Sequence, residues 1–274
     1  MSFTIQELEG CSIMDGHFKL KKLLGSGSFG TVYLATRARP GVGKEIGEKF
    51  AVKVIPRPEL ASEEKKKLDA ELKLQAMAGG HWNVVEVREV SYETLKGEEF
   101  ACIRMDLSEG GDMARAIRKG VFNKEERVRS AFLQIIDGML HCHENGVYHR
   151  DLKPGNVLFS MEGKNIRMRI ADFGLATDEK VCNDGRFPGT PKYMPPGLSM
   201  SVDPFFRAYM DDPSMLGQYL PRASNELVRM LRRSVLTLDP SSRVSLQELR
   251  DFVETAPLFK EGREKGFLAK IFNV

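Results

Sequence analysis

The chain has 274 residues, of which 42% are hydrophobic and 29% are charged, as in a soluble globular protein large enough to bury a core. Its 41 basic and 38 acidic residues leave a net charge of +3, too small to indicate nucleic acid or an anionic membrane as the main partner. Scattered cysteines without a CxxC pair, no long apolar run and no signal-peptide pattern predict free thiols and a cytoplasmic or nuclear location, without a zinc site or disulfide framework.

The first part of the chain is rich in strand patterns. After an irregular leader over 1–17, we expect strands at 18–24, 31–35 and 50–55, with a Gly- and Pro-containing loop between the second and the third. A helix follows over 63–77, with Leu68, Leu72 and Ala76 on its apolar face. Two more strands are expected at 84–90 and 100–107. Gly110-Gly111 then breaks the chain, which divides a β-rich region, 18–109, from a second region, 110–257.

The second region reads as mainly helical. A helix over 124–145 carries an apolar stripe that is best interpreted as core: Val128, Phe132, Ile135, Ile136 and Met139. Short strands are expected at 157–159 and 168–170, and helices at 225–236 and 245–253. Ser245 and Glu248 fit a capping box at the start of the last helix. The tail, 258–274, has an apolar pattern, and we expect it to dock on its own domain rather than on a partner.

A glycine-rich stretch, Gly25-Ser26-Gly27-Ser28-Phe29-Gly30, lies between the first two strands. G-x-G-x-x-G alone is weak evidence, because dinucleotide-binding folds use a similar pattern in which the glycines open a helix. Here a strand pattern follows instead. Lys53 stands in the otherwise apolar third strand, whereas a lone strand lysine usually points to solvent.

Two further motifs lie in the second region: His149-Arg150-Asp151-Leu152-Lys153-Pro154-Gly155-Asn156 and Asp172-Phe173-Gly174. The order of glycine loop, lysine, H-R-D and D-F-G resembles the eukaryotic protein kinase family, in its serine/threonine branch. The resemblance implies an α+β, bilobal fold with a β-rich N-lobe at 18–109 and a helical C-lobe at 110–257. It also implies Mg²⁺ and ATP as cofactors and a protein Ser/Thr hydroxyl as acceptor.

The resemblance assigns phosphate binding to the glycine loop and to Lys53. Gly25, Gly27 and Gly30 would let the backbone approach the phosphates, because a Cβ would obstruct that contact. Glu71 is implied as the ion-pair partner of Lys53. Three other acidic residues compete for that role but lie further from the apolar helix face: Glu63, Glu64 and Asp69.

The H-R-D and D-F-G motifs imply the remaining chemistry. Asp151 would accept or orient the substrate hydroxyl proton, and Lys153 would lie near the transferred phosphate and favour Ser/Thr substrates. Asn156 and Asp172 offer the hard oxygen ligands that suit Mg²⁺. The alternative for Asp151, a turn or capping aspartate, is disfavoured by the motif residues around it.

By the same resemblance Met105 would be the gatekeeper, and the backbone of Asp106 to Ser108 would face the adenine. Asp112 would reach the ribose or the substrate. Ordinary linker roles remain the alternative for these residues. The apolar candidates around the adenine are Val32, Ala51 and Phe159.

The sequence departs from the family at the end of the activation segment. The usual A-P-E reads Pro195-Pro196-Gly197, so Arg243, in the place of the arginine that pairs with the glutamate, is expected to be a buried charge without a partner, at a cost of about 3–5 kcal/mol. No Ser or Thr lies between Asp178 and Pro188, so acidic residues there could provide a fixed negative charge in place of phosphate: Asp178, Glu179 and Asp184. Activation independent of phosphorylation is therefore a hypothesis.

The larger departure is a helix. The family's D-x-W-x-x-G helix has no counterpart, because the chain's one tryptophan, Trp82, falls in the small lobe and 198–223 lacks a sustained apolar helical period. We expect the helix at 124–145 to expose apolar faces as a result. The stretch from Asp203 to Tyr209 resembles the later C-lobe of fungal Ran1-type kinases.

These observations leave three interpretations. The first is an active, monomeric Ser/Thr kinase, the second a nucleotide-binding pseudokinase or scaffold with a defective C-lobe, and the third a product that does not fold stably. No catalytic residue of the motifs is lost, which favours the enzyme.

Overall fold

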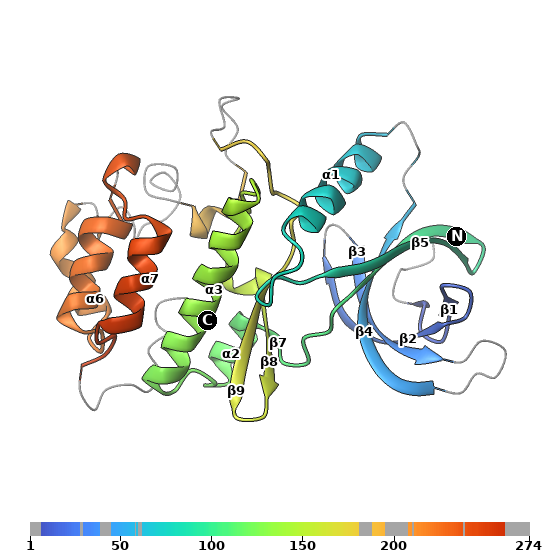
Figure 1. The fold of residues 1–274 in the computed structure, drawn as a ribbon, viewed down its shortest axis with the longest axis horizontal. Helices are drawn as coiled ribbons and strands as arrows, with labels where there is room; N and C mark the ends of the chain where they lie inside the picture. The colour runs from blue at the N-terminus through green and yellow to red at the C-terminus, as the bar shows by residue number, and fades with distance from the viewer. Residues whose placement is uncertain are drawn as a thin grey trace. The chain divides into compact units, whose positions relative to one another are not determined.

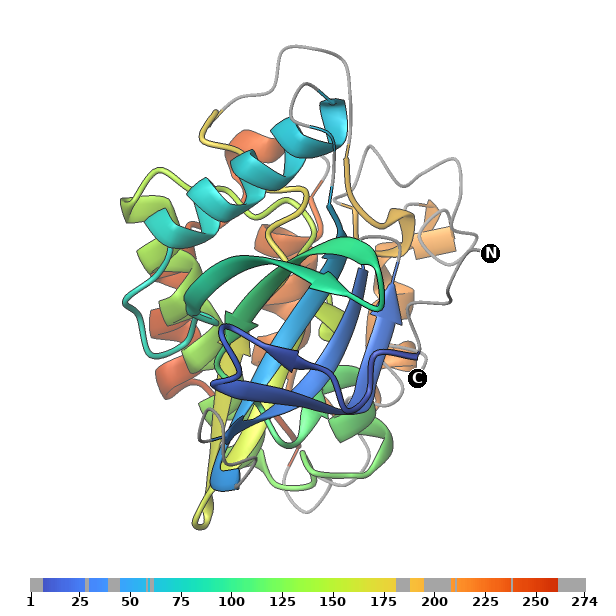
Figure 2. The same cartoon turned by 90° about the vertical axis from the view of Figure 1, so that its right-hand side faces the viewer.

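Alternating hydrophobic residues build a six-stranded antiparallel sheet in the computed structural model, which describes residues 7–27, 30–38, 45–57, 59, 62–180, 188–194, 208–209, 211–237 and 239–260. The strands are hydrogen-bonded in the order β1-β2-β3-β4-β6-β5. Figures 1 and 2 show the sheet from two sides. Its strands are β1 (Ser12–Ile13), β2 (Phe18–Gly27), β3 (Gly30–Ala38), β4 (Glu45–Pro56), β5 (Val87–Leu95) and β6 (Glu98–Met105). The predicted α+β class is confirmed by this sheet and by the helical part below.

The two faces of the sheet bury different clusters, because successive strand residues point to opposite sides. One face carries a cluster that includes Tyr33, Val52 and Val54. The same cluster contains Leu8, Ile13 and Met14, so residues of the predicted leader belong to the core. On the other face Ile103 packs with Leu68 of the helix α1 (Glu63–Met77).

Helix α1 begins and ends where the sequence pattern placed it. Ser62 caps it by accepting a hydrogen bond from the backbone N–H of Lys65 at 3.1 Å, which satisfies one of the free amides of the first turn. The predicted apolar face was partly wrong, because Ala76 is exposed and Leu74 is buried.

The chain forms two compact units, and each is described by itself. Unit 1 comprises 1–80 and 85–108; unit 2 comprises 81–84 and 109–274. Trp82 therefore lies in unit 2, not in the small lobe as expected.

Unit 2 contains β7 (Gly111–Asp112), β8 (Val157–Glu162) and β9 (Asn165–Ile170), paired in that order. Its helices are α2 (Met113–Arg118), α3 (Glu125–Glu144), α5 (Leu216–Tyr219), α6 (Asn225–Met230) and α7 (Leu246–Thr255), with a π-helical turn, η5, over Leu231–Val235. Short 3₁₀ turns cover Pro154–Asn156, Pro191–Tyr193, Pro213–Met215 and Pro240–Ser242.

The prediction that α3 exposes its apolar stripe was wrong. Val128, Ile135, Ile136 and Met139 are all buried, and α7 packs along α3 (Figure 1). Arg250 of α7 donates to Asp137 of α3 at 2.7 Å. Helix α7 is thus one of the elements that contact α3, and the segment in which the absent helix was expected, 195–207, lies outside the described residues.

The segment after α7 is fastened to the start of α3. The carboxylate of Glu125 accepts from the backbone N–H groups of Leu258, at 3.0 Å, and Phe259, at 3.2 Å. It also accepts from Arg129, whose guanidinium donates to the carbonyl of Val253. Leu258 and Phe259 are buried in the core of unit 2. The rest of the predicted tail, 261–274, lies outside the described residues.

Arg243 is not the buried charge that the sequence suggested. Its side chain is half-exposed, and its Nε donates to the carbonyl of Thr237 at 3.2 Å. The expected penalty of about 3–5 kcal/mol for a buried unpaired charge therefore does not apply. Pro195 to Gly197 lie outside the described residues. The capping box of α7, between Ser245 and Glu248, is confirmed.

None of the helices that the structure describes is both long and apolar enough to cross a bilayer.

Candidate active site

Four of the predicted nucleotide-binding residues share one face of the unit 1 sheet. Val32 of β3 pairs with Lys53 of β4, and Ala51 of β4 pairs with Met105 of β6. Cross-strand partners and residues two apart on a strand point to the same side. The sheet therefore presents one lysine among apolar side chains on the face that also carries α1.

Lys53 and Glu71 form an ion pair. Nζ of Lys53 lies 2.7 Å from Oε1 of Glu71, and the two side chains are only 14% and 11% exposed. Glu71 projects from α1 on the stripe that includes Leu68. Two of the three rivals pair with lysines of their own helix: Glu63 with Lys66 at 2.7 Å, and Asp69 with Lys65. The third, Glu64, is exposed.

The glycine loop joins β2 to β3, with Gly25 opposite Val32 and Gly27 opposite Gly30. Gly30 has a φ of +129°, and a Cβ there would lie 2.7 Å from the carbonyl oxygen of Val54. Glycine at this position is thus required by close packing on β4. An added Cβ at Gly25 would meet no atom of the described chain within 4 Å. Ser28 and Phe29 lie outside the described residues.

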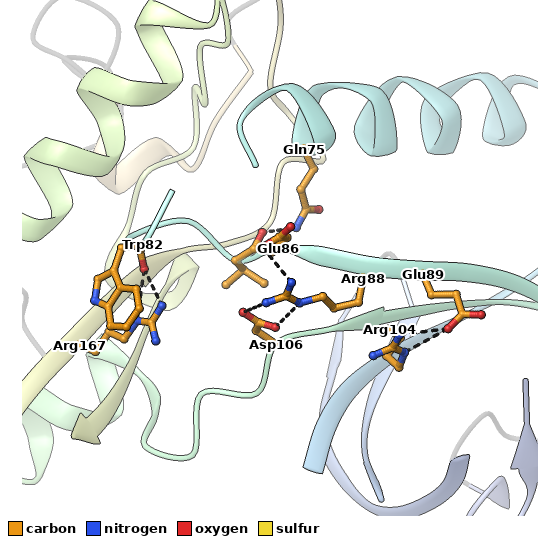
Figure 3. A network of polar contacts seen from close by, with 9 residues as sticks. Gln75, Trp82, Glu86, Arg88, Glu89, Arg104, Asp106 and Arg167 are labelled. Carbon is orange, nitrogen blue, oxygen red and sulfur yellow. Dashed lines mark hydrogen bonds and ion pairs between the residues drawn. The ribbon is translucent and has the colours of Figure 1, made fainter. Parts of the chain in front are cut away.

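Ion pairs with Arg88 hold the start of the segment that follows β6. Arg88 donates to the two carboxylate oxygens of Asp106 at 2.7 and 3.2 Å, and also pairs with Glu86 at 3.3 Å (Figure 3). The backbone N–H of Asp106 donates to the carbonyl of Glu86 at 3.3 Å. These contacts fix the position of the backbone from Asp106 to Ser108. The side chain of Ser108 is buried.

In unit 2 the carboxylate of Asp151 is surrounded by donors. Oδ1 accepts from the backbone N–H and the hydroxyl of Thr190, at 2.8 and 2.7 Å. Oδ2 accepts from Lys153 at 2.6 Å and from Asn156 at 3.1 Å. Lys153 also donates to the Thr190 hydroxyl at 2.7 Å. One residue of the activation segment, a lysine and an amide thus fix a single carboxylate.

These donors keep Asp151 ionised. Burial by itself raises the pKa of this carboxyl, but the hydrogen bond and charge of Lys153 and the hydrogen bonds from Thr190 together outweigh burial and lower its pKa. The Asp151 side chain is 7% exposed. At neutral pH the site therefore holds an acceptor, not an acid.

His149 connects the two motifs. It is 1% exposed. The Nε2 atom of its ring lies 3.0 Å from the carbonyl oxygen of Ala171. Its Nδ1 atom accepts a hydrogen bond from the backbone N–H of Asp151 at 3.3 Å. Burial lowers the pKa of His149, so the ring is neutral at pH 7. It fixes the backbone on both sides of the site.

Asn156 and Asp172 are brought together by the backbone. The N–H of Ala171 donates to the carbonyl of Asn156 at 2.9 Å, and Asp172 is the next residue. Asp172 is exposed and has a φ of +66°, and Arg150 has +61°; such strained residues gather at functional sites. The amide nitrogen of Asn156 donates to Asp151, which leaves its carbonyl oxygen as a ligand. An amide oxygen and a carboxylate fit a hard cation such as Mg²⁺.

Comparison with known proteins identifies the family. Residues 18–211 match the family model described as "Protein kinase domain". The chain belongs to the protein kinase family. We call the β-rich unit 1 the N-lobe and the mainly helical unit 2 the C-lobe.

Three relatives illustrate which protein kinases this chain is similar to in sequence. It is 31% identical to a calcium/calmodulin-dependent protein kinase type II of Caenorhabditis briggsae, over 72% of this chain and 35% of that protein. It is 28% identical to the serine/threonine-protein kinase ksp1 of Schizosaccharomyces pombe, over 86% and 56%. It is 30% identical to CBL-interacting protein kinase 16 of Oryza sativa, over 90% and 57%. The kinase thus spans about a third to just over half of these relatives, and the finer likeness to Ran1-type kinases stays a prediction.

Leu158, in the sheet of unit 2, is a candidate site residue that the sequence analysis missed. Asp112 pairs with Leu158, and Gly111 with Phe159. Phe159 is buried in the C-lobe core, where a Cβ on Gly110 would lie 2.3 Å from its ring, whereas Leu158 is half-exposed on the side of Asp112. Strand alternation at 157–159 was the available signal. Asp112 itself caps α2 by accepting from the N–H of Arg115 at 2.7 Å.

Proposed function

We propose that this kinase transfers the γ-phosphoryl group of Mg·ATP to a Ser or Thr hydroxyl of a protein substrate. The observation that carries the proposal is the Asp151 carboxylate, ionised and fixed by Lys153, Thr190 and Asn156. Phosphoryl transfer demands positioning and charge stabilisation more than covalent chemistry from the protein. A carboxylate held by four contacts provides such positioning.

Each residue has a task in this proposal. Asp151 would exchange its hydrogen bond from the Thr190 hydroxyl for one from the substrate hydroxyl, and so orient that oxygen. It would take up the proton as the bond from this oxygen to phosphorus forms and the bond from phosphorus to the departing ADP oxygen breaks. Lys153 neutralises charge on the transferred group. In the N-lobe, Lys53 binds phosphate oxygens, and Glu71 keeps its ammonium in place. Gly25, Gly27 and Gly30 supply a backbone that approaches the phosphates closely.

The remaining residues hold the cofactor. Asn156 and Asp172 would coordinate Mg²⁺, which would offset the negative charge of the phosphate groups. Val32, Ala51 and Met105 would contact the adenine, with the backbone of Asp106 to Ser108 beside it. In the C-lobe we assign this contact to Leu158 rather than Phe159, because Phe159 is committed to the core. Asp112, with one oxygen engaged in capping α2, would meet the ribose or the substrate.

A monomer in the cytoplasm or nucleus completes the proposal. The location is supported by three free cysteines among the described residues, Cys11, Cys102 and Cys142, as expected in a reducing compartment.

The test is turnover with a basic protein as acceptor, comparing the wild type with Asp151→Asn. Losing the carboxylate that orients and deprotonates the hydroxyl is expected to lower kcat by about 10²–10⁴-fold. Asp211→Asn, an exposed residue outside the site, is the matched control and should turn over like the wild type. Equal rates for wild type and Asp151→Asn would refute the proposal and leave a nucleotide-binding pseudokinase.

A further inference from the structure

The turn His81–Val84 is built into the C-lobe through Asn83. This side chain is 6% exposed. Its Nδ2 donates to the carbonyl of Met168 in β9 at 2.8 Å and to Gln134 of α3 at 3.0 Å. Its own carbonyl accepts from the N–H of Ile170 at 2.8 Å, and a Cβ on Gly138 of α3 would lie 2.9 Å from that carbonyl oxygen. Asn83 is therefore fastened to a strand and a helix at once.

The strand that Asn83 holds leads directly to the metal site. Ile170 is followed by Ala171 and then by Asp172. The N–H of Ile170 is bound by Asn83, and the N–H of Ala171 by the carbonyl of Asn156. Two successive amides before Asp172 are thus fixed from different segments. The carboxylate of Asp172 is placed by this backbone, because no side-chain hydrogen bond to it occurs within the described residues.

His81 determines the shape of the turn. Its Nδ1 accepts the backbone N–H of Asn83 at 3.1 Å, which requires a lone pair and hence a neutral ring. The ring stacks on His141 of α3, with centroids 4.7 Å apart and planes at 21°. Protonation of Nδ1 would set a donor against a donor and a cation against the second imidazole.

In the part of the chain that the structure describes, the titratable groups that act on His81 all belong to α3. Burial, and after it the charge of His141, lower the pKa of His81, whereas Asp137 and Glu144 raise it by less. Asp137 is also engaged by Arg250. The folded protein thus binds this proton less readily than the unfolded chain. The contact is therefore present above the unfolded pKa of about 6.5 and is lost as the pH falls below it, towards the lower folded value.

We propose that His81, stacked on His141, is a proton-sensitive positioning device for Asp172: while the His81 ring is neutral the turn fixes the end of β9, and protonation of His81 releases it. His81 is a positioning residue, since it acts only through Asn83. The inference rests on the proposed kinase function for its effect on turnover, but its structural effect can be measured without turnover.

The variants separate the acceptor from the charge. His81→Asn keeps an oxygen that can accept the N–H two residues on and does not titrate. His81→Ala removes the acceptor. The control is His143→Asn. His143 is a half-buried histidine of α3, the helix that also carries His141. Burial lowers the pKa of His143 too, but its ring packs on Tyr148 and not on His81. All are made in the full chain.

Two measurements at pH 7.5 and 5.5 test the device: hydrogen-exchange protection of the Ile170 amide in the protein alone, and the Mg²⁺ concentration giving half-maximal phosphotransfer. In the wild type we expect protection to fall and the Mg²⁺ requirement to rise on the order of tenfold at pH 5.5, as for other groups that orient metal ligands. His143→Asn should do the same. His81→Asn should respond at neither readout, and His81→Ala should resemble the acidified wild type at both pH values.

The inference is overturned if His81→Asn loses protection on acidification as the wild type does, or if His143→Asn abolishes the response. Failure of the kinase proposal is distinguishable. A chain without turnover at either pH, whose Ile170 protection still falls with acid in the wild type and not in His81→Asn, would refute that function and support this device.

Discussion

Lys53 shows what single residues can and cannot reveal. The A-V-K pattern picked out the lysine, but its partner had to be chosen among four acids of one helix. The choice depends on which side of α1 faces the sheet, and Glu71 is 2.7 Å from Lys53 while Glu63 and Asp69 bind lysines of their own helix. Buried apolar residues at helical spacing carried most of that information. The role of the pair stays a proposal.

Glu71→Gln tests that role. Losing the carboxylate leaves the ammonium of Lys53 without its ion pair, so kcat/KM for ATP should fall about tenfold or more, each factor of ten corresponding to about 1.4 kcal/mol. Glu63→Gln, an exposed pair on the same helix, should stay within about twofold, since surface pairs contribute little. Equal effects of the two substitutions would show that Lys53 works without Glu71.

At the scale of elements, long periodic segments were predictable and short or tertiary ones were not. The bounds of α1 and the capping box of α7 followed from the sequence. The two-residue β7 and the short α2 were missed because so few residues carry no clear period. That α7 covers α3 could not be inferred, because the apolar stripe of α3 shows only that something packs on it. For this reason its predicted exposure was wrong.

Val253→Ala tests the contact of α7 with α3. Val253 is 4% exposed, so losing two buried carbons should lower the unfolding free energy by about 1.6 kcal/mol, at roughly 0.8 kcal/mol each. The same substitution at Val90, which is 37% exposed, should cost about 0.5 kcal/mol or less. Urea titrations give both values. If Val253→Ala unfolds at the same urea concentration as Val90→Ala, α7 does not cover the core.

For the whole molecule, the order of motifs predicted the kinase fold, and the match over 18–211 shows the family. The boundary near Gly110 was close to the observed division after residue 108, but the excursion of 81–84 into unit 2 was not foreseen. Nothing in the local pattern distinguishes a turn of one unit from a turn of the other. Each unit nevertheless has its own core and its own set of site residues.

A thermal melt with and without Mg·ATP tests most directly whether those residues form a working nucleotide site. A ligand at a hundred times its Kd adds about 2.7 kcal/mol to the stability of the native state. We predict one cooperative transition that moves upward with Mg·ATP and that moves much less in Asp172→Asn. A chain that melts without cooperativity, or whose melting temperature is the same with and without Mg·ATP, would contradict the account.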